Sequence, residues 1–149
     1  DMIARIEARN KTILLPVDHY VTTDIKSGRA TLCANQGIPD DVMGIDIGPQ
    51  TLKMYETAIR EAKTIFWNGP MGVFEVENFS KGTFGVAKAM SENTGMTIVG
   101  GGDSAAAAEV SGYASKMTHI STGGGASLEY LQGDRLPGLE ALRNRKAML

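Results

Sequence analysis

Short apolar runs alternate with amphipathic stretches along the chain. Four runs rich in β-branched residues are each followed by a loop that contains glycine or proline; they cover residues 11–14, 63–66, 96–99 and 117–120. Between them lie helical patterns, the clearest of which follows Pro49. Buried strands that alternate with helices are typical of a parallel sheet with helical crossovers. We therefore predict an α/β fold of three layers around a mostly parallel, Rossmann-like sheet.

Residues 17–48 interrupt this alternation. Residues 21–25 and 29–33 have strand-like composition and flank Ser27 and Gly28, a pair that favours a turn. The pattern predicts a β-hairpin inserted into the parallel fold. Residues 37–48 show no clear period, and we expect a loop-rich segment there.

Two glycine-rich loops each join a predicted strand to a predicted helix. Residues 100–104 are Gly-Gly-Gly-Asp-Ser, and residues 121–127 are Ser-Thr-Gly-Gly-Gly-Ala-Ser. Glycine lets a ligand approach the backbone, and the first turn of a helix offers unpaired N–H groups that suit phosphate. Since the carboxyl ends of parallel strands share one edge, both loops should face one cleft with residues 14–18 and 68–75. Asp103 is suited to hold a counter-cation there.

Simpler explanations of these residues stay open at this point. A single triple-glycine loop is equally well explained by close helix–strand packing, and Asp103 by an ordinary helix N-cap. Glu75 has the character of a solvated carboxylate, Asn68 of a turn residue and Gly44 of a turn glycine with positive φ. Two phosphate-type loops on one sheet edge favour a ligand site over these alternatives.

Composition narrows the class of protein. The 149 residues suit one domain, and a net charge of −2 with a pI near 5.7 argues against nucleic-acid binding. No apolar run reaches the roughly 18 residues that a membrane span needs. With one cysteine, Cys33, the chain cannot form an internal disulfide, which fits a reducing, cytoplasmic compartment. The spacing of Cys33 from His19 and His119 is not that of zinc ligands.

Two well-known nucleotide motifs are not supported. The chain has no P-loop. Residues 81–83 (Lys-Gly-Thr) have the wrong order, and the glycines that precede the lysine in that motif are missing. Residues 100–105 do match the loose dinucleotide fingerprint, which also needs an acidic residue about 20 positions later. Ser121 and Thr122 occupy that place, so an NAD site is disfavoured.

Three long motifs follow one another along the chain. They are residues 67–75 (Trp-Asn-Gly-Pro-Met-Gly-Val-Phe-Glu), residues 100–104, and residues 121–129, which end in Ala-Ser-Leu-Glu. In this order and spacing they resemble the carboxyl-terminal, nucleotide-binding domain of the phosphoglycerate kinase family. The resemblance extends over nearly the whole chain, with shorter matches at residues 15–18, 37–39, 43–46, 48–49 and 136–139.

The resemblance implies a role for each matched position. Asp103 would hold Mg²⁺. Backbone N–H groups would meet the transferred phosphoryl group at Thr122, Gly123 and Gly124. The other positions would bind ATP or ADP, with Gly44, Val73 and Glu75 around adenosine and Asn68, Gly101, Gly102, Asp103 and Ser104 around the phosphates. Phosphoryl transfer depends mainly on positioning and charge neutralisation, which such groups supply.

The family's reaction is implied as well: reversible phosphoryl transfer between ATP and the carboxylate of 3-phosphoglycerate, giving ADP and 1,3-bisphosphoglycerate, in glycolysis. By the same resemblance, the chain would correspond to the second half of the nucleotide domain, without the amino-terminal domain that binds 3-phosphoglycerate in the family. We expect little or no kinase activity from these residues alone, a monomeric parent enzyme, and exposed apolar surface that favours self-association. A non-catalytic nucleotide-binding module and a folding fragment without a ligand remain alternatives.

Overall fold

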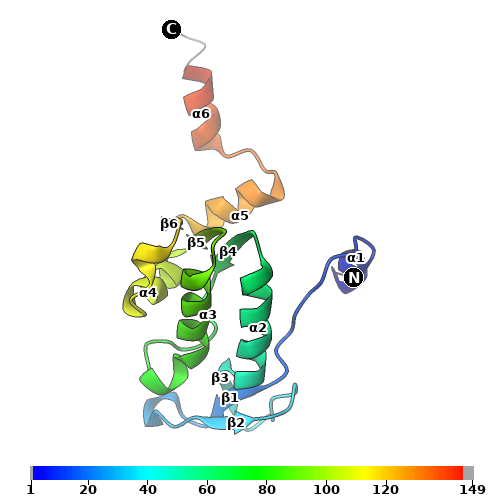
Figure 1. The fold of residues 1–149 in the computed structure, drawn as a ribbon, viewed down its shortest axis with the longest axis vertical. Coiled ribbons are helices and arrows are strands. Elements are labelled where there is room, and N and C mark those ends of the chain that lie inside the picture. The colour runs from blue at the N-terminus through cyan, green and yellow to red at the C-terminus, as the bar shows by residue number, and fades with distance from the viewer. Residues whose placement is uncertain (1, 146–149) are drawn as a thin grey trace.

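The chain folds into two small sheets and a set of helices (Figure 1). The structure, a computed structural model, describes residues 2–145. Its helices are α1 (Met2–Glu7), α2 (Pro49–Glu61), α3 (Lys81–Glu92), α4 (Gly102–Val110), α5 (Gly124–Gln132) and α6 (Pro137–Arg145). Its strands are β1 (His19–Thr22), β2 (Thr31–Cys33), β3 (Met43–Ile47), β4 (Thr64–Asn68), β5 (Met96–Gly100) and β6 (His119–Ser121). Short 3₁₀ turns are η1 (Ile25–Ser27), η2 (Glu77–Phe79) and η3 (Ala114–Lys116).

Strands β4, β5 and β6 form a parallel sheet in that order, as the apolar runs predict. Helix α3 connects β4 to β5, and α4 with η3 connects β5 to β6. The last residues of the three strands, Asn68, Gly100 and Ser121, are register partners, so the strands end level with one another. The predicted parallel α/β architecture is confirmed, although the last strand begins at His119 and not at residue 117.

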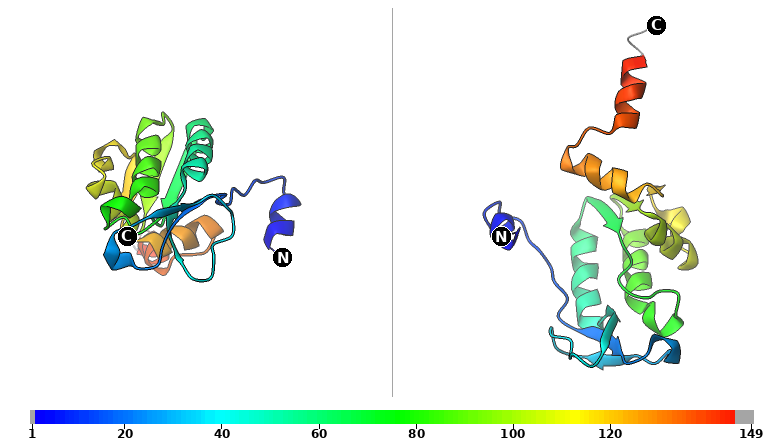
Figure 2. Two further views of the ribbon diagram at one scale, coloured as in Figure 1. Left: turned by 90° about the horizontal axis from the view of Figure 1, so that it is seen from below. Right: turned by 180° about the vertical axis from the view of Figure 1, so that it is seen from behind.

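One face of the parallel sheet carries the core. Its buried members are Trp67, Phe74, Val86, Ala87, Met90, Val99, Ala107, Ala108 and Met117. Leu52 and Ile59 of α2 pack against them, so α2, α3 and α4 cover this face. The alternate strand residues Phe66 and Ile98 face the other side, where α5 lies (Figure 2). Helices on both faces give the three predicted layers.

A second, antiparallel sheet has the strand order β2-β1-β3. Strands β1 and β2 form the predicted hairpin around η1. Strand β3, in a segment expected to be a loop, pairs with the other edge of β1. Because Ile45, Asp46 and Ile47 are all buried, β3 has no alternation of polar and apolar residues that would reveal it in the sequence.

The predicted strand at residues 11–14 does not form. This segment leads from α1 to β1 without regular structure, and Ile13 and Leu14 are 39% and 38% exposed. A strand needs a neighbour to pair its N–H and C=O groups, and none of the described strands borders these residues. Their β-type composition alone therefore gave a wrong prediction.

Helix α2 begins at a buried hydrogen-bond network that includes an aspartate from outside the helix. Its N-cap, Gly48, offers no side chain. Asp18, fully buried, accepts hydrogen bonds from the N–H of Gln50 (2.9 Å), the N–H of Thr51 (2.8 Å) and the Thr51 hydroxyl (2.6 Å). Burial, the largest single influence, raises the pKa of Asp18, but these hydrogen bonds outweigh it and leave the pKa below its ordinary value.

Candidate functional site

The loops after β4, β5 and β6 meet at the carboxyl edge of the parallel sheet. Asn68 Nδ2 donates to the Gly100 carbonyl (2.8 Å), and the Gly101 N–H donates to the Ser121 carbonyl (2.9 Å). A Cβ added to Gly124 would lie 2.7 Å from Gly101 Cα and 2.9 Å from Asn68 Nδ2. The two glycine loops therefore touch backbone to backbone, with Asn68 beside both. The prediction that the loops after the parallel strands share one sheet edge is confirmed. Its extension to residues 14–18 is wrong, because they precede β1 of the other sheet and Asp18 lies at the start of α2.

Helix α4 starts in the first glycine loop. Its N-cap, Gly101, has a φ of 101°, which glycine adopts without strain. The first helical residues, Gly102, Asp103 and Ser104, have N–H groups with no acceptor inside the helix. The Asp103 carboxylate is exposed and has no hydrogen-bond or ion-pair partner among residues 2–145. The N-cap explanation of Asp103 is wrong, because Gly101 holds that position.

Ser104 ties this loop to the loop after β4. Its side chain is 1% exposed, and Oγ accepts a hydrogen bond from the Gly69 N–H (2.6 Å). Asn68 is the last residue of β4, so the turn-residue explanation of Asn68 is wrong. The side chains of Asn68 and Ser104 thus make their hydrogen bonds within the protein and fix the three loops relative to one another.

Helix α5 starts in the second glycine loop. Its N-cap is Gly123, whose carbonyl accepts from the N–H (3.0 Å) and the hydroxyl (2.9 Å) of Ser127. Thr122 and Gly123 are exposed, whereas Gly124 is buried against the first loop. Since Gly124 is the first helical residue, the first turn of α5 presents its free N–H groups beside those of α4.

The glycines of the two loops fall into two groups. At Gly100 and Gly124 an added Cβ would overlap the Phe66 ring or the Gly101 backbone, so packing explains why glycine is needed. At Gly102 and Gly125 an added Cβ would meet no atom within 4 Å. Packing within the chain does not explain these two glycines, and the space beside them leaves room for a ligand to approach the backbone.

A second group of predicted residues lies where β3 meets the loop after β4. The Val73 N–H donates to the Ile45 carbonyl (2.9 Å), which brings Val73 beside the strand that contains Gly44. The φ of Gly44 is not positive, so the turn-glycine explanation is wrong. A Cβ at Gly44 would lie 2.6 Å from Ile38 Cδ1. Glu75 is exposed in the same loop, two residues after Val73.

Asp46 is a buried carboxylate in this region that was not among the predicted site residues. It is 4% exposed on β3 and accepts hydrogen bonds from the N–H of Gly82 (2.7 Å) in α3 and from the N–H of Ile47 (2.9 Å). Burial raises the pKa of Asp46 to about 6, although these hydrogen bonds and the charge of Lys81 act in the opposite direction. The available signal was a carboxylate between Ile45 and Ile47 in an apolar segment.

Thr83 is a second buried residue that the sequence did not single out. It lies in the first turn of α3 with no exposed surface. Its Oγ1 accepts hydrogen bonds from the N–H groups of Met71 (3.0 Å) and Gly72 (3.2 Å) in the loop after β4. The start of α3 therefore holds the loop that carries Val73.

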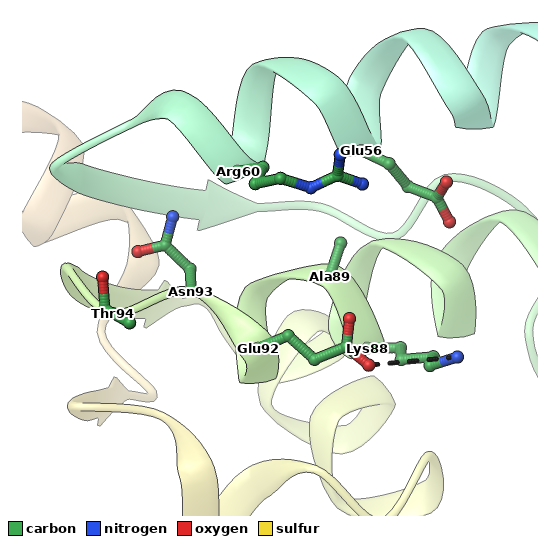
Figure 3. A pocket seen from close by; sticks show the side chains of 7 residues that line it. All are labelled: Glu56, Arg60, Lys88, Ala89, Glu92, Asn93 and Thr94. Carbon is green, nitrogen blue, oxygen red and sulfur yellow. Dashed lines mark ion pairs between the residues drawn. The ribbon is translucent and has the colours of Figure 1, made fainter.

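A hollow of about 520 Å³ lies at the opposite edge of the parallel sheet (Figure 3). Charged residues near the ends of α2 and α3 line it, among them Glu56, Arg60, Lys88 and Glu92. Lys88 Nζ and Glu92 Oε1 are 3.9 Å apart and both side chains are exposed, a type of ion pair that contributes little to stability. None of the predicted site residues lines this hollow.

Metal binding at the carboxyl edge of the parallel sheet, where the glycine loops lie, would depend on a single carboxylate. Among the described residues, no group of three or more histidine, cysteine or acidic side chains could hold a metal ion. Asp103 alone still fits Mg²⁺, which proteins often bind through one or two carboxylates together with substrate phosphates and water.

Among residues 2–145, no helix has the length and apolar character to cross a membrane.

Comparisons with known sequences agree with the motifs. The family model described as phosphoglycerate kinase matches residues 1–134. A phosphoglycerate kinase of Bdellovibrio bacteriovorus is 64% identical over 146 residues, which make up 97% of this chain and 36% of that protein. One of Clostridium botulinum is 57% identical over 144 residues, again 97% of this chain and 36% of that protein.

Solved structures give the same result. The phosphoglycerate kinase of Coxiella burnetii superposes with a TM-score of 0.85 at 38% identity, over 93% of this chain and 36% of that one. That of Pyrococcus horikoshii OT3 gives a TM-score of 0.74 at 39% identity, over 86% of this chain and 32% of that one. The chain thus spans about a third of the length of the relatives it matches. It belongs to the phosphoglycerate kinase family.

Proposed function

We propose that this chain forms the nucleotide-binding part of a phosphoglycerate kinase, within the carboxyl-terminal domain of the family. The observation that carries the proposal is the contact between Gly101 and Gly124, which sets the starts of α4 and α5 together at one sheet edge. Each start offers free N–H groups and the positive end of a helix dipole, and both suit phosphate groups. The open space at Gly102 and Gly125 supports close approach of such a ligand.

Asp103 is the proposed ligand of Mg²⁺. Its carboxylate is exposed, has no partner among the described residues, and lies in the first turn of α4 beside the N–H groups assigned to phosphate. When bound, the ion neutralises phosphate charge during phosphoryl transfer. Asp103 would hold the ion on the nucleotide side of the site.

The remaining predicted positions are assigned to three roles: binding adenosine, contacting the phosphoryl group in transfer, and supporting the loops. We assign Gly44, Val73 and Glu75 to the adenosine end, because β3 and the loop after β4 meet there. The backbone N–H groups of Thr122, Gly123 and Gly124 are assigned to the phosphoryl group in transfer, although that of Gly123 donates to Ser121 Oγ (3.3 Å) without a ligand. The side chains of Asn68 and Ser104, already paired within the protein, would support the loops that contact the phosphates.

The reaction proposed for the whole protein is reversible phosphoryl transfer between ATP and the carboxylate of 3-phosphoglycerate, giving ADP and 1,3-bisphosphoglycerate. Family membership supports this reaction. For the 149 residues by themselves we propose nucleotide binding with little or no turnover, because the residues assigned above all serve the nucleotide and its phosphates. A coupled kinase assay that showed turnover near that of an intact family member would contradict this part of the proposal.

Calorimetric titration with Mg-ADP tests the nucleotide site. We expect binding that requires Mg²⁺ and that Asp103→Asn weakens by about tenfold or more, because the ion loses its carboxylate ligand. Glu109→Gln is the matched control, since it removes the same charge from an exposed position at the other end of α4 and should leave the affinity unchanged. Binding without Mg²⁺ dependence, or equal losses in both variants, would overturn the assignment of Asp103.

A further inference from the structure

Three elements around the proposed adenosine end are joined by hydrogen bonds into a closed ring. Strand β3 joins the start of α3 through the Asp46 carboxylate, which accepts from the Gly82 N–H (2.7 Å). The start of α3 joins the loop after β4 through Thr83 Oγ1, which accepts from two N–H groups of that loop (3.0 and 3.2 Å). The loop returns to β3 through the Val73 N–H and the Ile45 carbonyl (2.9 Å).

The two side chains that close the ring are buried, and the glycines beside them are tightly packed. Asp46 is 4% exposed and Thr83 has no exposed surface. A Cβ added to Gly72 would lie 2.7 Å from Asp46 Oδ1, and one added to Gly82 would overlap the same carboxylate. Opening the bond between Asp46 and Gly82 leaves the buried Gly82 N–H without this acceptor, which is costly. The three elements are therefore held as one unit.

We infer that Asp46 and Thr83 are positioning residues for nucleotide binding, which hold Val73 against β3 so that Val73 and Gly44 form one wall of the adenosine end. The inference rests on the proposed function, because it concerns the same site. Neither side chain has to touch the nucleotide. Their effect passes through the loop after β4. Thr83 accepts hydrogen bonds from two N–H groups of this loop, and Gly72 of the loop packs on Asp46.

Helix α2 supplies a matched control for Thr83. Thr51 is the third residue of α2, as Thr83 is of α3, and both have no exposed surface. Thr51 Oγ1 also accepts from two backbone N–H groups, those of Val17 (3.0 Å) and Asp18 (3.2 Å). These groups precede β1 and lie outside the ring. Thr51→Val therefore removes hydrogen bonds of the same kind, together with the bond that the Thr51 hydroxyl donates to Asp18, without affecting the loop after β4.

Titration of the full chain with Mg-ADP, at a temperature where each variant is folded by circular dichroism, tests the inference. We expect Thr83→Val to weaken binding about fivefold, the effect of losing well-placed hydrogen bonds. Thr83→Ser keeps the hydroxyl and should restore the affinity to within about twofold. Thr51→Val should lower the melting temperature and leave the affinity unchanged. Asp46→Asn should weaken binding in the same direction as Thr83→Val.

Amide hydrogen exchange of the ligand-free chain gives a second readout. Thr83→Val should speed exchange at Met71, Gly72 and Val73, and Thr51→Val should not. Unchanged exchange at Val73, unchanged affinity in Thr83→Val, or an equal loss of affinity in Thr51→Val would each overturn the positioning role. Lack of Mg-ADP binding by the unmodified chain would instead overturn the proposed function, and the inference with it.

Discussion

Helices α2 and α3 begin in nearly the same way, yet the buried aspartates at their starts differ in pKa. In each helix the N-cap residue makes no side-chain hydrogen bond to the helix, and an aspartate from outside the helix accepts from the N–H at the second helical position. The pKa of Asp18, at α2, lies below its ordinary value, and the pKa of Asp46, at α3, is raised to about 6.

Two things differ between the carboxylates: their donors, and how deeply each lies among protein atoms, which is deeper for Asp46. Burial opposes ionisation at both sites. Asp18 accepts from two helix N–H groups and from the Thr51 hydroxyl, and together these outweigh burial. Asp46 accepts from one helix N–H and from the N–H of its neighbour Ile47, which do not outweigh it. The balance between the depth of burial and the number and kind of donors decides whether such a carboxylate favours its charged form.

The largest difference between the two starts is expected on truncation. Asp18→Ala removes the acceptor of three donors, the N–H of Gln50 and the N–H and hydroxyl of Thr51, and should lower the free energy of unfolding by about 3 kcal/mol. Asp46→Ala leaves two donors unpaired but removes a charge that burial disfavours, so we expect about 1–2 kcal/mol. Urea unfolding followed by the fluorescence of Trp67, the one tryptophan of the chain, measures both.

The exposed Asp40 offers a control for this pair, because Asp40→Ala should change stability by less than about 0.5 kcal/mol. Equal losses in Asp18→Ala and Asp46→Ala, at equal dependence on urea, would contradict the account based on donors.

The dependence of stability on pH should have opposite sign at the two sites. Asp18, with a lowered pKa in the fold, stabilises the protein above the pKa of the unfolded chain, about 4, and this contribution is lost as the pH falls through the folded value. Asp46, with a raised pKa, contributes most below pH 4, and its contribution is lost as the pH rises through about 6. Each slope is at most about 1.4 kcal/mol per pH unit.

Asparagine variants separate the two slopes. Asp46→Asn should flatten the change in stability between about pH 4 and pH 6, and Asp18→Asn should flatten the change below about pH 4. Urea unfolding at several pH values measures both. If Asp46→Asn altered only the range below pH 4, the pKa assigned to Asp46 would be wrong.

The smallest expected effect concerns Lys81, whose charge lowers the pKa of Asp46 but is not among the influences on Asp18. Lys81→Gln should raise the pKa of Asp46 further and leave Asp18 unchanged, as measured by NMR titration of the carboxyl carbons. Lys88→Gln, at an exposed position later in α3, is the control and should move neither. A shift of equal size in Lys88→Gln would show that the general charge of the helix, and not Lys81, is responsible.

Local patterns predicted much of the fold. The parallel strands and α2 follow from apolar periodicity and from Pro49, and the hairpin follows from Ser27 and Gly28. The errors arose where pairing partners decide the structure. Strand β3 forms because β1 lies beside it, and residues 11–14 form no strand because none of the described strands borders them. A sequence pattern does not show which segments become neighbours.

In the candidate site, too, some features were predictable from the sequence and others were not. The glycine loops were predictable because a strand, glycines and a helix start follow one another directly in the sequence. The contacts of Asp46 with Gly82 join residues 36 positions apart, and those of Ser104 with Gly69 join residues 35 apart. No local pattern marks such pairs, so their supporting roles emerge only from the structure.

The contact between Gly101 and Gly124 bears on the entropy of ligand binding. Backbone atoms meet there, and the neighbouring Asn68 side chain is already hydrogen-bonded to the Gly100 carbonyl, so a ligand would have few side-chain rotamers to freeze. A ligand that reached both helix starts would therefore meet donors whose relative orientation is already set, and such pre-organisation raises affinity without additional contacts. An alanine at position 124 would separate the two helix starts, and the change would alter their spacing before it altered any chemical group that a ligand touches.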